Sequence, residues 1–135
     1  MKLLTKEIRE KLLKNGREQA KAKGTKAEKD FWPVVKLFYP AGGQTWLLTE
    51  LDPEEEDVAW GLCDLAMGFP EFGTVRISEL ESFVDTAGLC IERDRFFEAK
   101  APISRYIDAA NAAGCIVESL PPSSATNPSP GLRQR

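Results

Sequence analysis

Four short segments rich in β-branched and aromatic residues follow one another between residues 33 and 77. They cover residues 33–39, 44–51, 58–65 and 74–77, and proline, glycine or aspartate residues separate them. β-branched and aromatic residues favour strands, whereas proline, glycine and aspartate favour turns. Because consecutive strands joined by short turns pair antiparallel, the sequence predicts a four-strand antiparallel meander.

A helix is predicted before this meander. Leu4, Ile8 and Leu12 recur every four residues, which places them on one helical face, and Thr5 suits the N-cap position. Asn15-Gly16 favours the end of this helix. Residues 17–30 are interpreted as a charged connector, either as continued helix or as a loose chain, and we favour the loose chain after about residue 22.

Two further helices are predicted after the meander. Ser78 and Glu81 stand at the spacing of a capping box and predict a brief helix over 79–84. Pro102 lies near the start of another helix that runs to about Ala113, where Gly114 ends it. We expect all three helices to cover one face of the meander, which gives a two-layer α+β domain.

The chain of 135 residues contains 42% hydrophobic residues, enough for one core. We expect a single domain over residues 1–119 and a disordered Pro/Ser-rich tail over 120–135. No stretch has the length of a membrane span, and the N-terminus lacks the apolar region of a signal peptide. Cytoplasmic location, with no membrane association, is therefore expected, and the three cysteines are interpreted as reduced thiols.

Several kinds of chemistry are excluded by the residue types. The chain has no histidine, so a Ser-His-Asp or Cys-His site within it is impossible. It also lacks a Cys-x-x-C pair and both common glycine-rich phosphate motifs. We therefore predict no catalytic residue, no metal site and no cofactor, although enzymatic activity is left open with a preference against it.

The first thirty residues carry ten lysines and arginines against five acidic residues, while the whole chain has a net charge of −3. Contact with nucleic-acid phosphates is one interpretation, and a solvated helix face followed by a linker is the other. For the first interpretation, the candidate residues are Lys11, Lys14, Arg17, Lys21 and Lys23.

The acidic run over residues 50–57 is the second charged feature. Its candidate binding residues are Glu50, Asp52 and Glu54, which could imitate a phosphate backbone or hold a hard cation. The run lacks the pattern of an EF-hand loop. A solvent-facing turn between two strands is the interpretation we favour.

Trp46 and Trp60 are further candidates for a binding face. They lie in neighbouring predicted strands, so we expect that they can meet across the pair. Aromatic rings on strands can stack on bases, but packing in the core is the interpretation we favour.

Residues 92–95 alternate in charge. Glu92, Arg93 and Asp94 could form a site in which arginine grips an anion and a carboxylate acts as a base. The alternative, which we favour, is a set of ion pairs that ties a loop to the sheet.

Several of these segments together resemble a known family. They are the opening residues 1–9 and the runs 35–38, 45–46, 49–54, 60–62, 71–73, 77–80, 91–94 and 97–98. In this order they resemble the family of domain of unknown function 2958, over most of residues 1–98. The resemblance implies a small bacterial protein of the kind that accompanies plasmids, conjugative elements and phages. It implies no activity and no catalytic residue, and residues 17–30 and 100–135 depart from the shared pattern.

From these observations we expect a non-enzymatic accessory protein of a mobile genetic element. It would act by binding a protein or nucleoprotein partner, and inhibition of a host defence system is one such role. Two alternatives remain. One is a nucleic-acid-binding protein that uses the basic N-terminal arm, and the other is a small enzyme that uses the cluster from Glu92 to Asp94.

Overall fold

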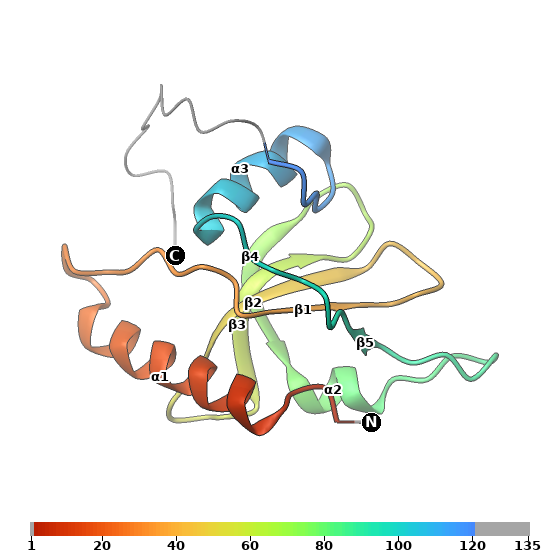
Figure 1. The fold of residues 1–135 in the computed structure, drawn as a ribbon, viewed down its shortest axis with the longest axis horizontal. Coiled ribbons are helices and arrows are strands. Elements are labelled where there is room, and N and C mark those ends of the chain that lie inside the picture. Colours follow the sequence, from red (N-terminus) through yellow and green to blue (C-terminus); the bar gives the residue numbers. More distant parts are fainter. Residues whose placement is uncertain (1, 121–135) are drawn as a thin grey trace.

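The computed structural model describes residues 2–120, which form an antiparallel sheet with helices packed against it (Figure 1). The sheet has five strands in the order β4-β3-β2-β1-β5. The α+β class and the meander of the first four strands are therefore confirmed. The elements are α1 (Lys6–Ala22), β1 (Val35–Phe38), β2 (Thr45–Leu51), β3 (Val58–Asp64), β4 (Glu71–Arg76), α2 (Ile77–Ser82), β5 (Glu92–Arg93) and α3 (Ile103–Ala113).

The fifth strand was not predicted. β5 has two residues, and it pairs with β1 so that Arg93 lies opposite Leu37 and Glu92 lies opposite Phe38. Two charged residues carry no strand signal of their own. The strand exists because the returning chain reaches the open edge of β1 and pairs with its backbone.

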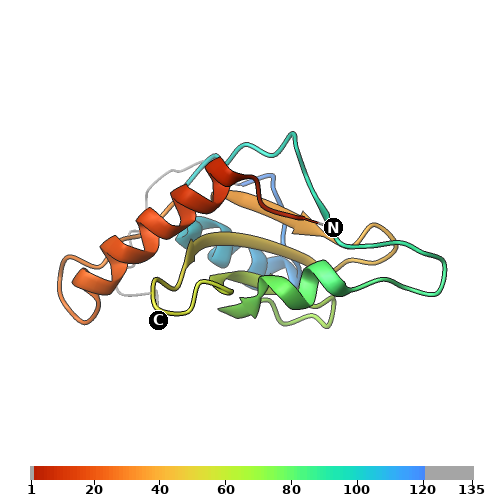
Figure 2. The ribbon, with the colours of Figure 1, turned by 90° about the horizontal axis from the view of Figure 1, so that it is seen from below.

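The helices are divided between the two faces of the sheet, and the expectation that they gather on one face is wrong. Leu12 of α1 and Leu80 of α2 share a core with Leu48, whereas Ile103 of α3 packs on the opposite face, beside Leu47. Figure 2 shows α1 and α2 in front of the sheet and α3 behind it. Every residue of β2 except the first is buried. A central strand that is buried on both sides is covered on both faces of the sheet, so the domain has three layers.

Helix α1 continues past the predicted stop at Asn15-Gly16. Thr5 is the N-cap, and its hydroxyl accepts the Ile8 N–H at 3.1 Å, as expected. The helix persists to Ala22 because Asn15 and Gly16 lie on its buried side, where the Asn15 amide donates to the Thr49 carbonyl at 2.9 Å. Tertiary contact thus outweighs the local stop signal, and the connector begins only after Ala22.

Helix α2 is not capped by Ser78. The helix starts at Ile77, with Arg76 in the N-cap position and no side-chain cap of its own. Asp57, from the turn between β2 and β3, accepts hydrogen bonds from the Ser78 backbone N–H at 2.9 Å and from its hydroxyl at 2.6 Å. A carboxylate distant in sequence therefore satisfies the free N–H of the first turn.

Two further expectations concern the C-terminal tail and membrane association. The tail predicted over 120–135 lies outside the described residues except for Leu120, which packs against the core beneath α3. Among the described residues, every helix is too short or too polar to cross a membrane.

Candidate binding pocket

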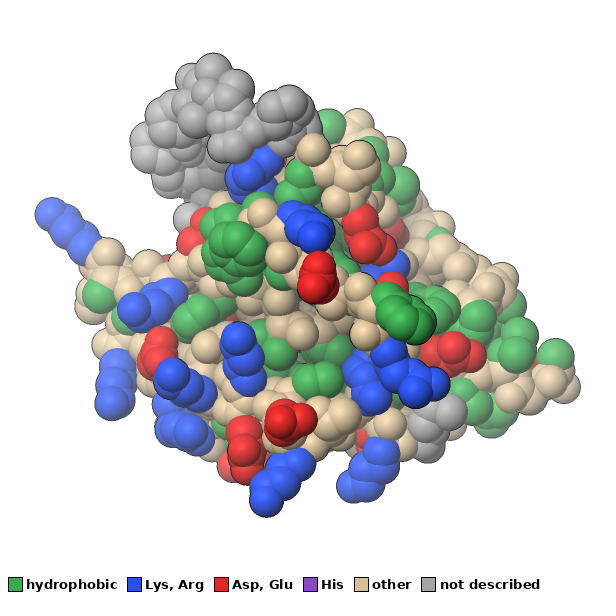
Figure 3. Space-filling view, viewed as in Figure 1, with side chains coloured by type: hydrophobic (Ala, Val, Ile, Leu, Met, Phe, Trp, Pro, Cys, Tyr) green, Lys and Arg blue, Asp and Glu red, His purple; other side chains and the backbone are tan. Residues whose placement is uncertain are grey.

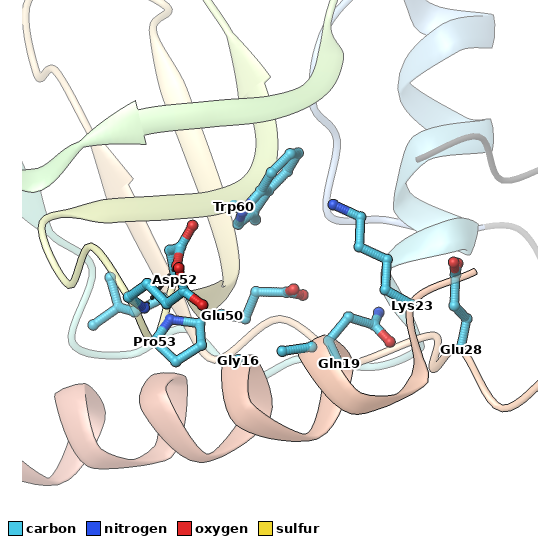
Figure 4. A pocket seen from close by; sticks show the side chains of 11 residues that line it. Gly16, Gln19, Lys23, Glu28, Glu50, Asp52, Pro53 and Trp60 are labelled. Carbon is cyan, nitrogen blue, oxygen red and sulfur yellow. Dashed lines mark hydrogen bonds between the residues drawn. The ribbon is translucent and has the colours of Figure 1, made fainter. Parts of the chain in front are cut away.

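A pocket of about 260 Å³ lies between the second half of α1 and the adjoining ends of β2 and β3 (Figure 4). Gly16 and Gln19 form one wall from α1, and Glu50 and Trp60 form another from the sheet. The remaining lining residues come from the end of α1 and the connector that follows it, and from the end of β2 and the turn that follows it. They are Ala20, Lys23, Glu28, Leu51, Asp52, Pro53 and Glu54.

A bulge in β2 decides which side chains face this pocket. Leu48 pairs with Gly61 and Glu50 pairs with Trp60, so Thr49 is one residue more than β3 matches. Without the extra residue, strict alternation would turn Glu50 into the apolar core of α1 and Leu51 out of it. The bulge places Leu51 in that core and Glu50 on the face that carries Trp60.

Glu50 lines the pocket, but only 4% of its surface is exposed to solvent. The Thr49 hydroxyl lies 3.1 Å from Glu50 Oε1 and donates to it, and the Trp60 carbonyl lies 3.3 Å from the same hydroxyl. Thr49, the extra residue of the bulge, therefore also orients the Glu50 carboxylate through a hydrogen bond.

Trp60 forms an aromatic wall next to this carboxylate. Its ring stacks on Phe72 of β4, with centroids 6.1 Å apart and an interplanar angle of 23°. The Lys23 ammonium lies 5.7 Å from the centroid of the Trp60 ring, within the range of a cation–π interaction. Figure 4 shows the Lys23 side chain reaching toward Trp60 from the end of α1, while Glu50 points into the space between them.

Gln19 fixes the connector that carries part of the pocket rim. Its amide group donates to the Lys29 carbonyl and accepts the Lys29 N–H, both at 2.9 Å, and Gln19 is buried. Glu28, in this same connector, accepts the Gly24 N–H at 2.7 Å. These bonds hold the connector in one conformation beside the helix.

The pocket is strongly acidic. Four carboxylates line it, from Glu28, Glu50, Asp52 and Glu54, and one ammonium, from Lys23. Such a site attracts positive charge, and its aromatic wall favours an organic cation. Within residues 2–120, no three cysteine or acidic residues are placed together to hold a metal ion.

The structure brings together four of the candidates named from the sequence: Glu50, Asp52, Glu54 and Trp60. It separates Trp46 from them, because Trp46 lies opposite Cys63 and faces the core of α1 and α2. The expected meeting of Trp46 and Trp60 across the strand pair is therefore wrong. Their register, set by the bulge, places Glu50 opposite Trp60 instead.

The acidic run has two parts. Glu50 belongs to β2, whereas residues 52–57 form the turn between β2 and β3, in which Glu54, Glu55 and Glu56 are exposed. Asp52 accepts the Glu54 N–H at 2.8 Å and so stabilises the turn. The interpretation as a solvent-facing turn therefore applies to residues 52–57 and not to Glu50.

The charged cluster at β5 lies beside a different hollow, near the start of α1. Arg93 donates to the Leu3 carbonyl at 2.6 Å, and Asp94 accepts the Phe96 N–H at 2.9 Å. Lys36 lies 3.5 Å from Asp94 and also pairs with Glu118. These contacts tie the N-terminal segment and the segment after α3 to the sheet.

The basic candidates on α1 occupy a different surface from the pocket, with one exception. Lys11, Lys14, Arg17 and Lys21 are exposed. Figure 3 shows basic side chains spread over the α1 side of the molecule, with acidic side chains among them. Lys23 is the exception, since it lines the pocket.

Sequence reasoning missed Gln19, Thr49 and Glu28. Gln19 carried a usable signal, because it lies seven residues after Leu12 on the face that α1 buries. A polar residue on an apolar helical face calls for a specific hydrogen-bond partner. Thr49 and Glu28 carried no comparable signal.

The fold and the pocket together define a small α+β domain with an acidic, aromatic-walled binding site. The family described as Protein of unknown function (DUF2958) matches residues 3–117, and the chain belongs to this family. No curated protein and no solved structure matches the chain.

Proposed function

We propose that this protein acts by binding a protein or nucleoprotein partner through a basic surface of that partner. The observation that carries the proposal is the acidic pocket, which four carboxylates and one ammonium line beside the half-buried ring of Trp60. The exposed Glu54 and Glu56 extend the same negative charge onto the adjoining turn, in which Glu55 pairs with Arg76. A concentrated negative surface accelerates and orients association with a positive one.

The wider role is an accessory protein of a mobile genetic element, working in the cytoplasm. This part of the proposal is supported by the resemblance of family members to proteins that accompany plasmids and phages. An acidic surface that competes for a basic nucleic-acid channel would inhibit a host defence complex. The pocket and the acidic turn are the surfaces suited to such competition.

A capture experiment tests the proposal. The tagged protein is used to retrieve host proteins, and quantitative mass spectrometry compares it with the variant Glu54→Lys/Glu56→Lys. The matched control is Glu10→Lys/Asp108→Lys, which makes the same change in charge at exposed positions of α1 and α3 away from the pocket. We expect a partner that the wild type and the control retain and the pocket-side variant loses. Retrieval that is the same for all three proteins would overturn the proposal.

A second candidate is nucleic-acid binding by α1. The observation in its favour is the exposure of Lys11, Lys14, Arg17 and Lys21 along one helix. Phosphate binding releases counterions, so affinity for a DNA or RNA duplex should fall steeply with rising salt. Fluorescence anisotropy of a labelled duplex between 50 and 200 mM salt measures this dependence. A weak and salt-independent signal would remove this candidate.

A further inference from the structure

We propose that the open edge of β4 pairs with the same edge of a second copy of this chain, so that two sheets join across a two-fold axis at Thr74. β4 is the outermost strand in the order β4-β3-β2-β1-β5, and within residues 2–120 no further strand lies beside it. An edge strand offers backbone N–H and C=O groups to another strand. This inference goes beyond the proposed function and does not rest on it.

The hydrogen bonds of the neighbouring strands show which residues of β4 turn their backbone outward. The Val58 carbonyl accepts the Asp52 N–H at 2.9 Å, so the backbone of Val58 faces β2 and that of Ala59 faces β4. Ala59 pairs with Val75, whose backbone therefore faces β3. Because backbone direction alternates along a strand, the next residues on either side face the open edge. The residues of β4 that face outward in this way are Phe72, Thr74 and Arg76.

β4 lacks three features that commonly protect an edge strand from pairing, namely a bulge, a proline and a lysine. It matches β3 over consecutive residues without a register shift, and residues 71–76 contain neither proline nor lysine. Thr74, near its centre, is exposed. The strand at the other edge of the sheet, β5, has only two residues. β4 is therefore the edge that a further strand can extend over a useful length.

The sequence of β4 is complementary to itself when two copies run antiparallel. In the register centred on Thr74, the Thr74 residues of the two copies face each other, and threonine pairs across strands are favourable. Phe72 then lies opposite Arg76 of the second copy, and Gly73 lies opposite Val75. The two-fold axis repeats each of these contacts.

The side chains of β4 suit this register. A Cβ atom at Gly73 would meet no atom within 4 Å, so there is room beside Gly73 for the Val75 side chain of the second copy. The Arg76 side chain is 46% exposed, although it pairs with Glu55. A guanidinium can pair with a carboxylate through its edge and stack on an aromatic ring through its face. Arg76 can therefore keep its ion pair and still contact Phe72 of the second copy.

The neighbouring registers fit less well. One is centred on Gly73 and places Arg76 opposite Pro70, which has no N–H to donate. The other extends the pairing to Ile77, where the strand has ended and α2 begins. The register centred on Thr74 pairs the outward-facing residues of β4 with one another and requires no change in either element.

Sedimentation equilibrium of the full chain between about 10 µM and about 1 mM tests the proposal. The average mass should rise from that of the monomer toward that of the dimer. Thr74→Lys should weaken association about fivefold or more, because two like charges then face each other on the axis. Thr86→Lys is the matched control, since it makes the same change at an exposed position in the loop after α2, and it should associate like the wild type.

A mixture of two variants tests the register. Thr74→Lys and Thr74→Glu should each be mainly monomeric alone, whereas their equimolar mixture should form a dimer because opposite charges face each other. Thermal unfolding of each variant shows that its fold is retained. Recovery in the mixture requires two folded chains that meet at position 74.

A wild type that is monomeric at about 1 mM would overturn the proposal. A dimer that Thr74→Lys leaves intact would also overturn it, as would a mixture that associates no better than either variant alone. If the Thr74 N–H of a monomeric protein became protected from hydrogen exchange only in the presence of a captured host protein, the edge would belong to a strand of that protein and not to a second copy.

Discussion

Gly16 of α1 lies against the backbone carbonyl of Leu51, and a Cβ atom at position 16 would stand 1.8 Å from the Leu51 oxygen. No side chain fits between the helix and the strand at this point. The close approach brings the second half of α1 onto the end of β2, and Gly16 thereby forms part of the pocket wall.

Gly16→Ala should lower the free energy of unfolding by about 2 kcal/mol, measured by urea denaturation. Alanine favours the helix over glycine by about 1 kcal/mol, but overpacking against a backbone atom costs more than this gain. Gly73→Ala is the control, because a Cβ there meets no atom within 4 Å. A stability equal to that of the wild type for Gly16→Ala would show that α1 can shift freely on the sheet.

Asp57→Ala should destabilise the domain by about 1 kcal/mol at neutral pH, because α2 loses the carboxylate that accepts the Ser78 N–H in its first turn. The Ser78 hydroxyl, with help from the Ser78 N–H and Arg76, lowers the pKa of Asp57 below its usual 3.8. A carboxyl group whose folded pKa is lowered stabilises the fold above its unfolded pKa. This contribution is lost as the pH falls below about 3.8.

Thermal unfolding of the wild type and of Asp57→Ala between pH 7 and pH 2 checks this expectation. The difference in stability should shrink as the pH falls, and Glu56→Ala, from the same turn but exposed, should show little difference at any pH. A difference that persists undiminished at pH 2 would assign the effect to packing rather than to the charge.

The thiol of Cys63 should be the least reactive of the three. Desolvation by burial, with repulsion from Glu71, raises its pKa from 9.0 to about 11, whereas Cys115 is exposed. Iodoacetamide at pH 8 should modify Cys115 quickly and Cys63 only after unfolding, because the thiolate is the reactive form. Mass spectrometry of the alkylated peptides measures both rates. Equal rates for the two cysteines would contradict the burial of Cys63.

The same shift predicts how stability changes in alkaline solution. The unfolded thiol ionises near pH 9.0 while the folded thiol stays protonated, so the free energy of unfolding should fall as the pH rises from 9 toward 11. Cys63→Ala should remove this part of the pH dependence, and Cys115→Ala should keep it.

Asp64→Ala should release the segment that follows α3. Asp64 is buried and accepts the Ala66 N–H at 2.8 Å and the Ile116 N–H at 2.9 Å. Two partly buried hydrogen bonds would lose their acceptor, and the cost for a fully buried group, about 1–3 kcal/mol, is the upper limit for each of them. Hydrogen exchange should accelerate most at Ile116. Unchanged protection of Ile116 would show that this segment is held by its apolar contacts instead.

Local sequence signals predicted most of the fold correctly. Strands alternate with turns between residues 33 and 77, and each signal is complete within a few residues, so these elements needed no knowledge of the rest of the chain. The same holds for Thr5, whose side chain caps the start of α1, and for Gly114, whose left-handed backbone (φ 79°) ends α3. Two local errors arose at Gly16 and Ser78, where a strand carbonyl and a distant carboxylate took the place of the local partner.

The sequence by itself thus determined the first four strands, the class of the fold and the acidic character of residues 50–57. Only the tertiary structure decided that Glu50 faces Trp60, that Trp46 does not, and that Lys23 reaches the same pocket. The bulge at Thr49 is the physical reason for the position of Glu50, whereas Trp46 precedes the bulge and lies opposite Cys63. Side chains alternate along a strand, so one extra residue reverses every later side chain, and its position depends on pairing with β3 and on the Asn15 contact from α1.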